Sequence, residues 1–277
     1  MINSQQARDL SRPEDLIAIR AFQAGRSVPL TGRKEVIAIF GANSGIGLGM
    51  SRSLLLKGFC VAALDSSREN LLPLQEKFPN LLALRCDFAR DEEIKEALDL
   101  IVRKWGAIDV LVSNLTDLQV TSLEALSVER SRECLEKNFL LPLKVLMEVL
   151  PQMENQGKGL VHLIVSAFAL AGLPGLHPII FSHSALEALS RSLDIESRKG
   201  GVRVNLMCDS IFTWRSSGDR ELEAVKVGEK LAREILTEKP IVTPDLATNL
   251  CLSFARRFPY FMGRISSWLI RSGLIEP

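Results

Sequence analysis

The chain has 277 residues, of which 47% are hydrophobic, enough for one large buried core. Thirty-four basic and thirty-three acidic residues leave a formal charge of +1, so the strongly basic surface of a nucleic-acid-binding protein is missing. Five scattered cysteines form no CxxC pair, which argues against a disulfide framework and a zinc site. No uncharged apolar run approaches the roughly 20 residues that span a bilayer. We expect a cytoplasmic protein that binds a small-molecule substrate, with no metal, nucleic acid or membrane as partner.

The first 32 residues lie outside the regular pattern and are interpreted as an N-terminal extension, with residues 33–277 as one domain. From Glu35 onward, short apolar runs alternate with helix-like segments. These runs are residues 36–40, 60–65, 81–87, 108–114, 160–166 and 202–208. Continuous apolar strands separated by helices indicate a parallel sheet covered on both faces. The predicted fold class is therefore α/β, with a Rossmann-type doubly wound parallel sheet in a single domain.

A glycine-rich turn, FGANSGIG at residues 40–47, follows the first predicted strand. Its glycines allow a tight turn and a close approach of the backbone to a pyrophosphate, while the following helix offers unpaired N–H groups at its amino terminus. The turn predicts dinucleotide binding, and an ordinary tight turn is the alternative. The cofactor contacts expected from it are Gly41, Asn43, Ser44, Gly45 and Ile46.

An acidic residue, Asp65, closes the second predicted strand. A carboxylate at this position can accept hydrogen bonds from the adenosine ribose hydroxyls and would repel a 2′-phosphate. This favours NAD over NADP, although Arg68 nearby weakens the preference. A helix cap for the next segment is the alternative interpretation of Asp65.

The glycine turn resembles the TGxxxGIG motif of the short-chain dehydrogenase/reductase family, and the similarity extends over roughly residues 33–275. Asp87 and Phe88 in RCDF resemble the family's adenine-contacting segment, and Asn114 lies in the segment that corresponds to its NNAG motif. Further similar segments are GLPG at 172–175, LEALSRSL at 186–193, VRVN at 202–205 and PDLA at 244–247. The resemblance implies a nicotinamide dinucleotide cofactor bound by these residues.

The family's catalytic residues are asparagine, serine, tyrosine and lysine, and only the first two are matched here. Asn138 and Ser166 stand 28 residues apart, which is the family's usual interval. The tyrosine and lysine positions then hold Ile179 and His183. An alternative register would place Phe181 at the tyrosine position, but it requires a two-residue insertion and puts alanine at the lysine position. The YxxxK pair is absent in either register.

The segments expected around the nicotinamide and substrate are also altered, since Leu115 and Thr116 follow Asn114, and Asp209 replaces the family's proline after the sixth strand. The remaining candidates for catalysis are Ser166, Asn138, His183 and Asp209, and His183 is also a candidate for ribose contact. The alternatives are a structural role for His183 within its helix and a turn-forming role for Asp209.

Three functions are compatible with this pattern. The first is a non-standard oxidoreductase or repurposed enzyme that catalyses iminium reduction, cyclisation or isomerisation of a small organic molecule. The second is a catalytically inactive cofactor sensor or partner subunit, and the third is a purely structural domain. The resemblance also implies a homodimer or homotetramer, formed through helices at about 127–150 and 182–198, and residues 212–243 are interpreted as a substrate lid.

Overall fold

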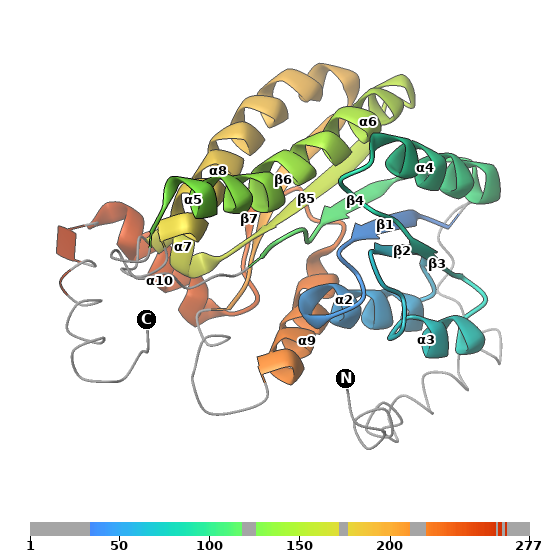
Figure 1. Cartoon of the computed structure of the whole chain (residues 1–277), viewed down its shortest axis with the longest axis horizontal. Coiled ribbons are helices and arrows are strands. Elements are labelled where there is room, and N and C mark those ends of the chain that lie inside the picture. Colours follow the sequence, from blue (N-terminus) through green and yellow to red (C-terminus); the bar gives the residue numbers. More distant parts are fainter. Residues whose placement is uncertain are drawn as a thin grey trace.

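A computed structural model describes residues 34–117, 126–171, 177–210, 220–258, 260–261 and 264. Its centre is one parallel seven-stranded sheet with the order β3-β2-β1-β4-β5-β6-β7 (Figure 1). The strands are β1 (Val36–Phe40), β2 (Cys60–Asp65), β3 (Leu81–Arg85), β4 (Val110–Ser113), β5 (Gly159–Val165), β6 (Val202–Cys208) and β7 (Ile241–Val242). The predicted doubly wound α/β fold is confirmed.

Two layers of helices cover the sheet, as Figure 1 shows. On one face pack α4 (Asp91–Trp105), α6 (Leu141–Asn155) and α8 (His177–Ser197), and on the other α2 (Gly45–Leu56), α3 (Leu72–Lys77) and α9 (Arg220–Leu231). Strand β1 shows why both layers are needed. Successive side chains of a strand point to opposite faces, so Phe40 joins the first core and Ile39 the second. A strand that is apolar at every position must be covered on both sides.

The shorter elements are α5 (Val128–Leu135), the π-helix η2 (Glu136–Leu140), α7 (Ala167–Ala171), the 3₁₀ turns η3 (Arg198–Gly200) and η4 (Ala232–Glu234), and α10 (Leu246–Arg257). None of the described helices is long and apolar enough to cross a membrane. The N-terminal extension, predicted as residues 1–32, lies outside the described residues.

The substrate lid stays a prediction for residues 212–243, which are described in part: they contain α9, η4 and β7. Residues 212–219 lie outside the described part, while α9 is a covering helix packed on α2. The two helices approach so closely that only glycine fits at two contact positions. A Cβ atom on Gly49 would lie 2.0 Å from the Val225 carbonyl oxygen, and one on Gly228 would lie 2.1 Å from the Ile46 carbonyl oxygen. Val227 of α9 is buried in the core, so this helix is part of the domain's framework.

Candidate dinucleotide site

The glycine turn between β1 and α2 has the close backbone contacts expected of a phosphate-binding turn. Gly41 has φ +80°, and a Cβ atom there would lie 2.5 Å from the Asn114 carbonyl oxygen. A Cβ atom on Gly47 would lie 2.0 Å from the Gly41 carbonyl oxygen. Both positions therefore exclude larger residues. A phosphate-binding turn needs glycine where backbone segments meet this closely, so the residues of the turn fit a dinucleotide phosphate.

Asp65 holds the glycine turn directly. Its Oδ2 accepts a hydrogen bond of 2.9 Å from the Asn43 backbone N–H, and its Oδ1 accepts one of 3.2 Å from the Ser66 hydroxyl. The Asn43 side chain accepts from the Asn70 backbone N–H, and the Asn70 amide donates to the Asn43 carbonyl oxygen. Asn43 thus connects the turn to the chain beyond β2, and the carboxylate of Asp65 lies beside the turn. The ribose contact of Asp65 stays a prediction.

Asn114 also acts on the turn. Its side-chain amide donates a hydrogen bond of 2.8 Å to the Gly41 carbonyl oxygen, and its backbone N–H donates to Phe40. The amide therefore fixes the end of β4 against the end of β1. This structural role is what the described contacts show, and the cofactor contact of Asn114 stays a prediction.

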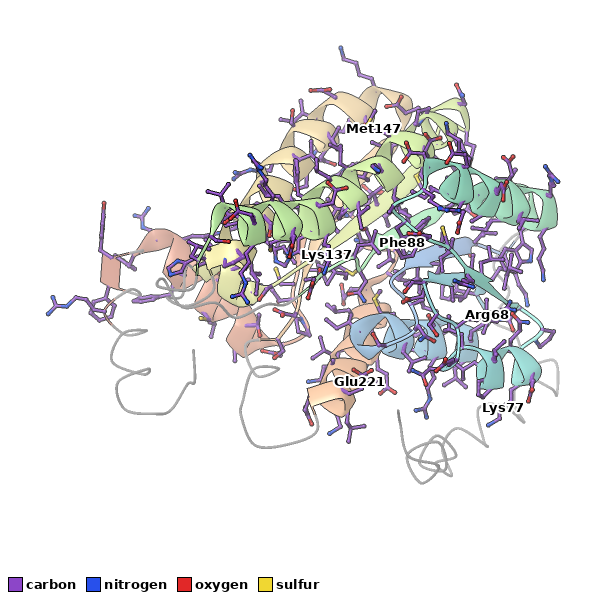
Figure 2. All side chains as sticks on the ribbon, in the orientation of Figure 1. Arg68, Lys77, Phe88, Lys137, Met147 and Glu221 are labelled. Carbon is purple, nitrogen blue, oxygen red and sulfur yellow. The ribbon has the colours of Figure 1, made fainter. Side chains whose placement is uncertain are left out.

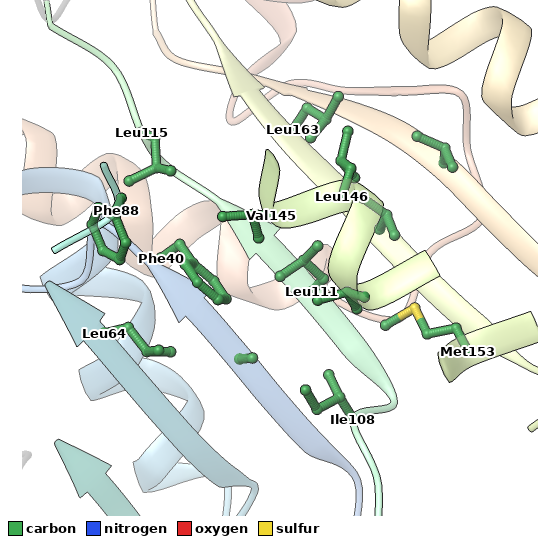
Figure 3. Packing of buried hydrophobic residues seen from close by; sticks show 14 of the residues in the cluster. Phe40, Leu64, Phe88, Ile108, Leu111, Leu115, Val145, Leu146, Met153 and Leu163 are labelled. Carbon is green, nitrogen blue, oxygen red and sulfur yellow. The ribbon is translucent and has the colours of Figure 1, made fainter. Parts of the chain in front are cut away.

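Of the two residues after β3 that are predicted to contact adenine, Asp87 lies at the surface and Phe88 lies in the core. The Asp87 side chain is 57% exposed and accepts a hydrogen bond from the Ala89 backbone N–H. Phe88 is only 8% exposed, and its ring lies 5.6 Å from that of Phe40, as Figure 3 shows. Asp87 is accessible to a ligand, whereas Phe88 contributes chiefly packing.

One acidic residue that no sequence motif indicates lies at this turn. The carboxylate of Glu221, near the start of α9, accepts a hydrogen bond from the backbone N–H of Gly45, the first residue of α2. The two residues are 176 positions apart in the chain. No sequence signal pairs them, because the contact depends on the packing of α9 against α2.

Asn138 is fully buried in the π-helix η2 and fixes the chain that follows β4. Its Oδ1 accepts a hydrogen bond of 2.6 Å from the Asp117 backbone N–H, and its Nδ2 donates one of 3.1 Å to the Asp117 carbonyl oxygen. Lys137 adds a 2.7 Å ion pair with the Asp117 carboxylate, and this hydrogen bond raises the pKa of Lys137. A π-turn inserted in a helix is often found at a functional site. Lys137 and Asp117 were not predicted as site residues.

The Asn138 amide also connects this segment to α8. Its Nδ2 lies 3.4 Å from the Ser182 hydroxyl oxygen and 3.1 Å from the Cys134 sulfur. Ser182 in turn donates to the Pro178 carbonyl oxygen at 2.8 Å. Burial raises the pKa of Cys134, so its thiol remains protonated at neutral pH. Asn138 therefore occupies a neutral hydrogen-bond network between three helices.

Ser166, at the end of β5, is brought together with His183 of α8, as the sequence register predicts. The Ser166 backbone N–H donates a hydrogen bond of 2.9 Å to His183 Nδ1. Burial lowers the pKa of His183 to about 4, so the ring is neutral at pH 7 and its proton resides on Nε2. Within the described part of the chain, neither the Ser166 Oγ nor the His183 Nε2 has a hydrogen-bond partner.

Asp209, at the end of β6, contacts the same junction. Its Oδ1 accepts a hydrogen bond of 2.6 Å from the backbone N–H of Ala167, the first residue of α7. His183 and Asp209 therefore satisfy two successive N–H groups where β5 passes into α7, a role usually taken by a local capping residue. These two hydrogen bonds favour a structural role over a catalytic role for both side chains.

Ile179, assigned by the sequence register to the tyrosine position, is fully buried on α8. Its side chain has no group that can transfer a proton. Among the described residues, no group of three or more His, Cys, Asp or Glu side chains is arranged to hold a metal ion.

A family model described as short chain dehydrogenase matches residues 35–219. This is well over half of the chain, and the chain therefore belongs to the short-chain dehydrogenase family. The similarity that the sequence motifs indicate is thus confirmed at the level of the family.

Two curated relatives illustrate the range of the family. L-fucose dehydrogenase of Oryctolagus cuniculus is 26% identical over 172 residues, covering 62% of this chain and 60% of that protein, so the match spans less than two thirds of the relative's length. The 2-(R)-hydroxypropyl-CoM dehydrogenase of Xanthobacter autotrophicus is 30% identical over 186 residues, covering 64% of this chain and 74% of that protein.

Solved structures show the same fold. A short-chain dehydrogenase from Streptomyces avermitilis has a TM-score of 0.70 at 21% identity, with 86% of this chain and 98% of that chain covered. ElxO with NADP bound has a TM-score of 0.67 at 18% identity, covering 78% of this chain and 99% of that one. An NADH-dependent reductase complexed with NAD has a TM-score of 0.62 at 19% identity, covering 76% and 95%. Similar folds therefore accommodate either dinucleotide.

Proposed function

We propose that this chain binds NAD in preference to NADP and acts as a non-standard oxidoreductase or repurposed enzyme on a small organic molecule. The observation that carries the proposal is the glycine turn, whose Gly41 and Gly47 are held against backbone at distances that exclude a side chain. Such a turn, at the amino terminus of a helix and beside the carboxyl ends of parallel strands, is the usual pyrophosphate site of a dinucleotide-binding fold.

The preference for NAD rests on Asp65. Its carboxylate lies beside the turn and is fixed there by the Asn43 N–H. A 2′-phosphate close to this carboxylate would meet like-charge repulsion, whereas ribose hydroxyls would find a hydrogen-bond acceptor. Gly41, Ser44, Gly45 and Ile46 would hold the phosphates.

Asp87 and Phe88 would border the adenine in this proposal, with the exposed carboxylate of Asp87 as the polar contact. The bound nicotinamide would supply hydride transfer. The Ser166 hydroxyl is buried and has no hydrogen-bond partner within the described residues. In this proposal it would donate a hydrogen bond to a substrate oxygen or nitrogen that reaches the end of β5.

The described site holds no acid that matches the family's tyrosine, because Ile179 stands in its assigned position. General acid catalysis contributes about 10²–10⁴ in rate, so reduction of an ordinary ketone would be slow. His183 does not replace it, since its ring is fully buried and neutral and its Nδ1 is already bonded to Ser166. A substrate that needs no proton from the protein, such as an iminium ion, fits these constraints better.

A catalytically inactive cofactor sensor or partner subunit is the second candidate. It is favoured by the backbone hydrogen bonds of His183 and Asp209, which assign both side chains to holding the junction of β5 and α7. In this case the dinucleotide would bind without turnover.

Mass spectrometry of the small molecules released from freshly purified protein tests both candidates. Recovery of NAD(H) together with a second organic molecule would support an enzyme, while NAD(H) alone would favour the sensor. If no dinucleotide is released and none binds in a titration, the proposed function is wrong.

A further inference from the structure

The amino terminus of α2 already carries an anion that belongs to the protein. Glu221 accepts a hydrogen bond from the Gly45 backbone N–H, at the point where a dinucleotide fold presents its free N–H groups to phosphate. Figure 2 labels Glu221 where α9 begins, beside α2. The second carboxylate oxygen of Glu221 lies 3.9 Å from the position that a Cβ atom on Gly45 would occupy. The carboxylate is thus beside the turn itself.

The packing of two helices fixes the backbone from which Glu221 reaches the turn. Gly49 of α2 and Gly228 of α9 let the helices meet at backbone contact, and Leu231 anchors α9 in the core. The Glu221 backbone is therefore held in place, while its side chain has three rotatable torsions. The contact with Gly45 can open by a change of rotamer alone, without movement of α9.

The other two acids of α9 are paired with cations. Glu223 forms an ion pair of 2.6 Å with Lys226, and Glu229 one of 3.8 Å with Arg52. Glu221 is instead directed at the backbone of the turn. Asp65 accepts from another donor of the turn, the Asn43 N–H, so carboxylates of the chain accept hydrogen bonds from two N–H groups of the turn.

A carboxylate and a phosphate oxygen that use the same N–H donor exclude one another, and their like charges repel at short range. We propose that Glu221 is an internal competitor for the cofactor phosphate, so that the dinucleotide binds only when the carboxylate leaves Gly45. This inference rests on the proposed dinucleotide-binding function. Glu221 then sets the affinity for the cofactor, and it stabilises the ligand-free protein as an acidic residue at a helix amino terminus.

The variant Glu221→Gln tests the competition, because it removes the charge and keeps the size of the side chain. Isothermal titration with NAD⁺, NADP⁺ and ADP should show binding about three- to thirtyfold tighter than that of the native protein. The melting temperature without ligand should fall by about 1–3 °C, since the helix loses its acidic partner. Glu221→Ala should change both quantities in the same directions.

The matched control is Glu223→Gln, which removes a carboxylate two residues away whose partner is Lys226. Its affinity for the three ligands should equal that of the native protein. If Glu221→Gln has a lower melting temperature but the same dinucleotide affinity as the native protein, the competition is wrong and Glu221 only caps the helix. The proposed function still holds in that case, provided that the native protein binds the dinucleotide. If Glu221→Gln binds a dinucleotide and the native protein does not, the competition is supported, while the native protein lacks the proposed dinucleotide binding. Absence of binding by both contradicts both proposals.

Discussion

The Nδ1 atom of His183 lies 2.9 Å from the backbone nitrogen of Ser166 and accepts its hydrogen bond. This single contact determines the chemistry available to the histidine. Protonation of Nδ1 would remove the acceptor and leave the Ser166 N–H unpaired in a buried place, and burial already lowers the pKa of the ring to about 4. His183 therefore cannot supply the positive charge that the family's lysine provides.

The buried histidines should make stability depend on pH. Burial lowers the pKa of both His162 and His183 to about 4 from an ordinary value of 6.5. The unfolded chain binds more protons than the native one between these values, so stability is fully present above pH 6.5 and is lost as the pH falls towards 4. The loss should be up to about 3 kcal/mol for each histidine.

Urea unfolding at a series of pH values measures this effect. His183→Asn keeps an acceptor for the Ser166 N–H and removes the titrating ring, so its slope between pH 6.5 and 4 should be smaller than that of the native protein. His162→Gln should reduce the slope in the same way, since its amide can donate to the Ile235 carbonyl oxygen as His162 does. If the unfolding free energy of both variants changes with pH as steeply as that of the native protein, the neutral state assigned to the two histidines is wrong.

The preference for NAD should depend on the charge of Asp65. The variant Asp65→Asn retains an oxygen acceptor for the Asn43 N–H, so the turn keeps its hydrogen bond while the repulsion of a 2′-phosphate disappears. We expect the ratio of NADP⁺ to NAD⁺ affinities to rise about tenfold. Calorimetric titration of both cofactors measures it, and native protein with equal affinity for the two would refute the role of Asp65.

Oxidation of simple secondary alcohols with NAD⁺ should be almost undetectable in the native protein, at least about 10²-fold below an ordinary family member. The double variant Ile179→Tyr with His183→Lys should recover measurable activity, because it restores a phenol and a cation that lowers its pKa. The recovery should be partial, since lysine cannot accept the hydrogen bond that the Ser166 N–H donates to His183. Neither single variant should match it. Both positions are fully buried, so the melting temperature of each variant must be measured alongside. Robust alcohol oxidation by the native protein would show that the tyrosine is dispensable.

A homo-oligomer should form through the outer surfaces of α6 and α8. Met147 of α6 is 66% exposed and is labelled in Figure 2. Ile195 of α8 is 70% exposed, so both helices have an apolar side chain facing solvent. Light scattering should give a multiple of the chain mass of 30.7 kDa. Met147→Glu or Ile195→Glu should shift the mass towards one chain. A native mass of one chain at micromolar concentration would rule the oligomer out.

The sequence by itself determined six of the seven strands of the described sheet. The predicted runs at 36–40, 60–65 and 202–208 agree with β1, β2 and β6, because a strand buried on both faces is mostly apolar, and this pattern is visible locally. The other three runs differ from the structure by one or two residues at their ends. The two-residue strand β7 was not predicted, since Ile241 and Val242 are too few to form a recognisable run.

The sequence also placed Ser166 near His183, because fixed spacing within a known motif brings the end of β5 to the helix α8. It could not show that the ring of His183 faces backbone, since the direction of a side chain depends on what surrounds it in the core. The bond between Glu221 and Gly45 was beyond any sequence pattern. It exists because the two helices α2 and α9, far apart in the chain, cover the same face of the sheet and meet through Gly49 and Gly228.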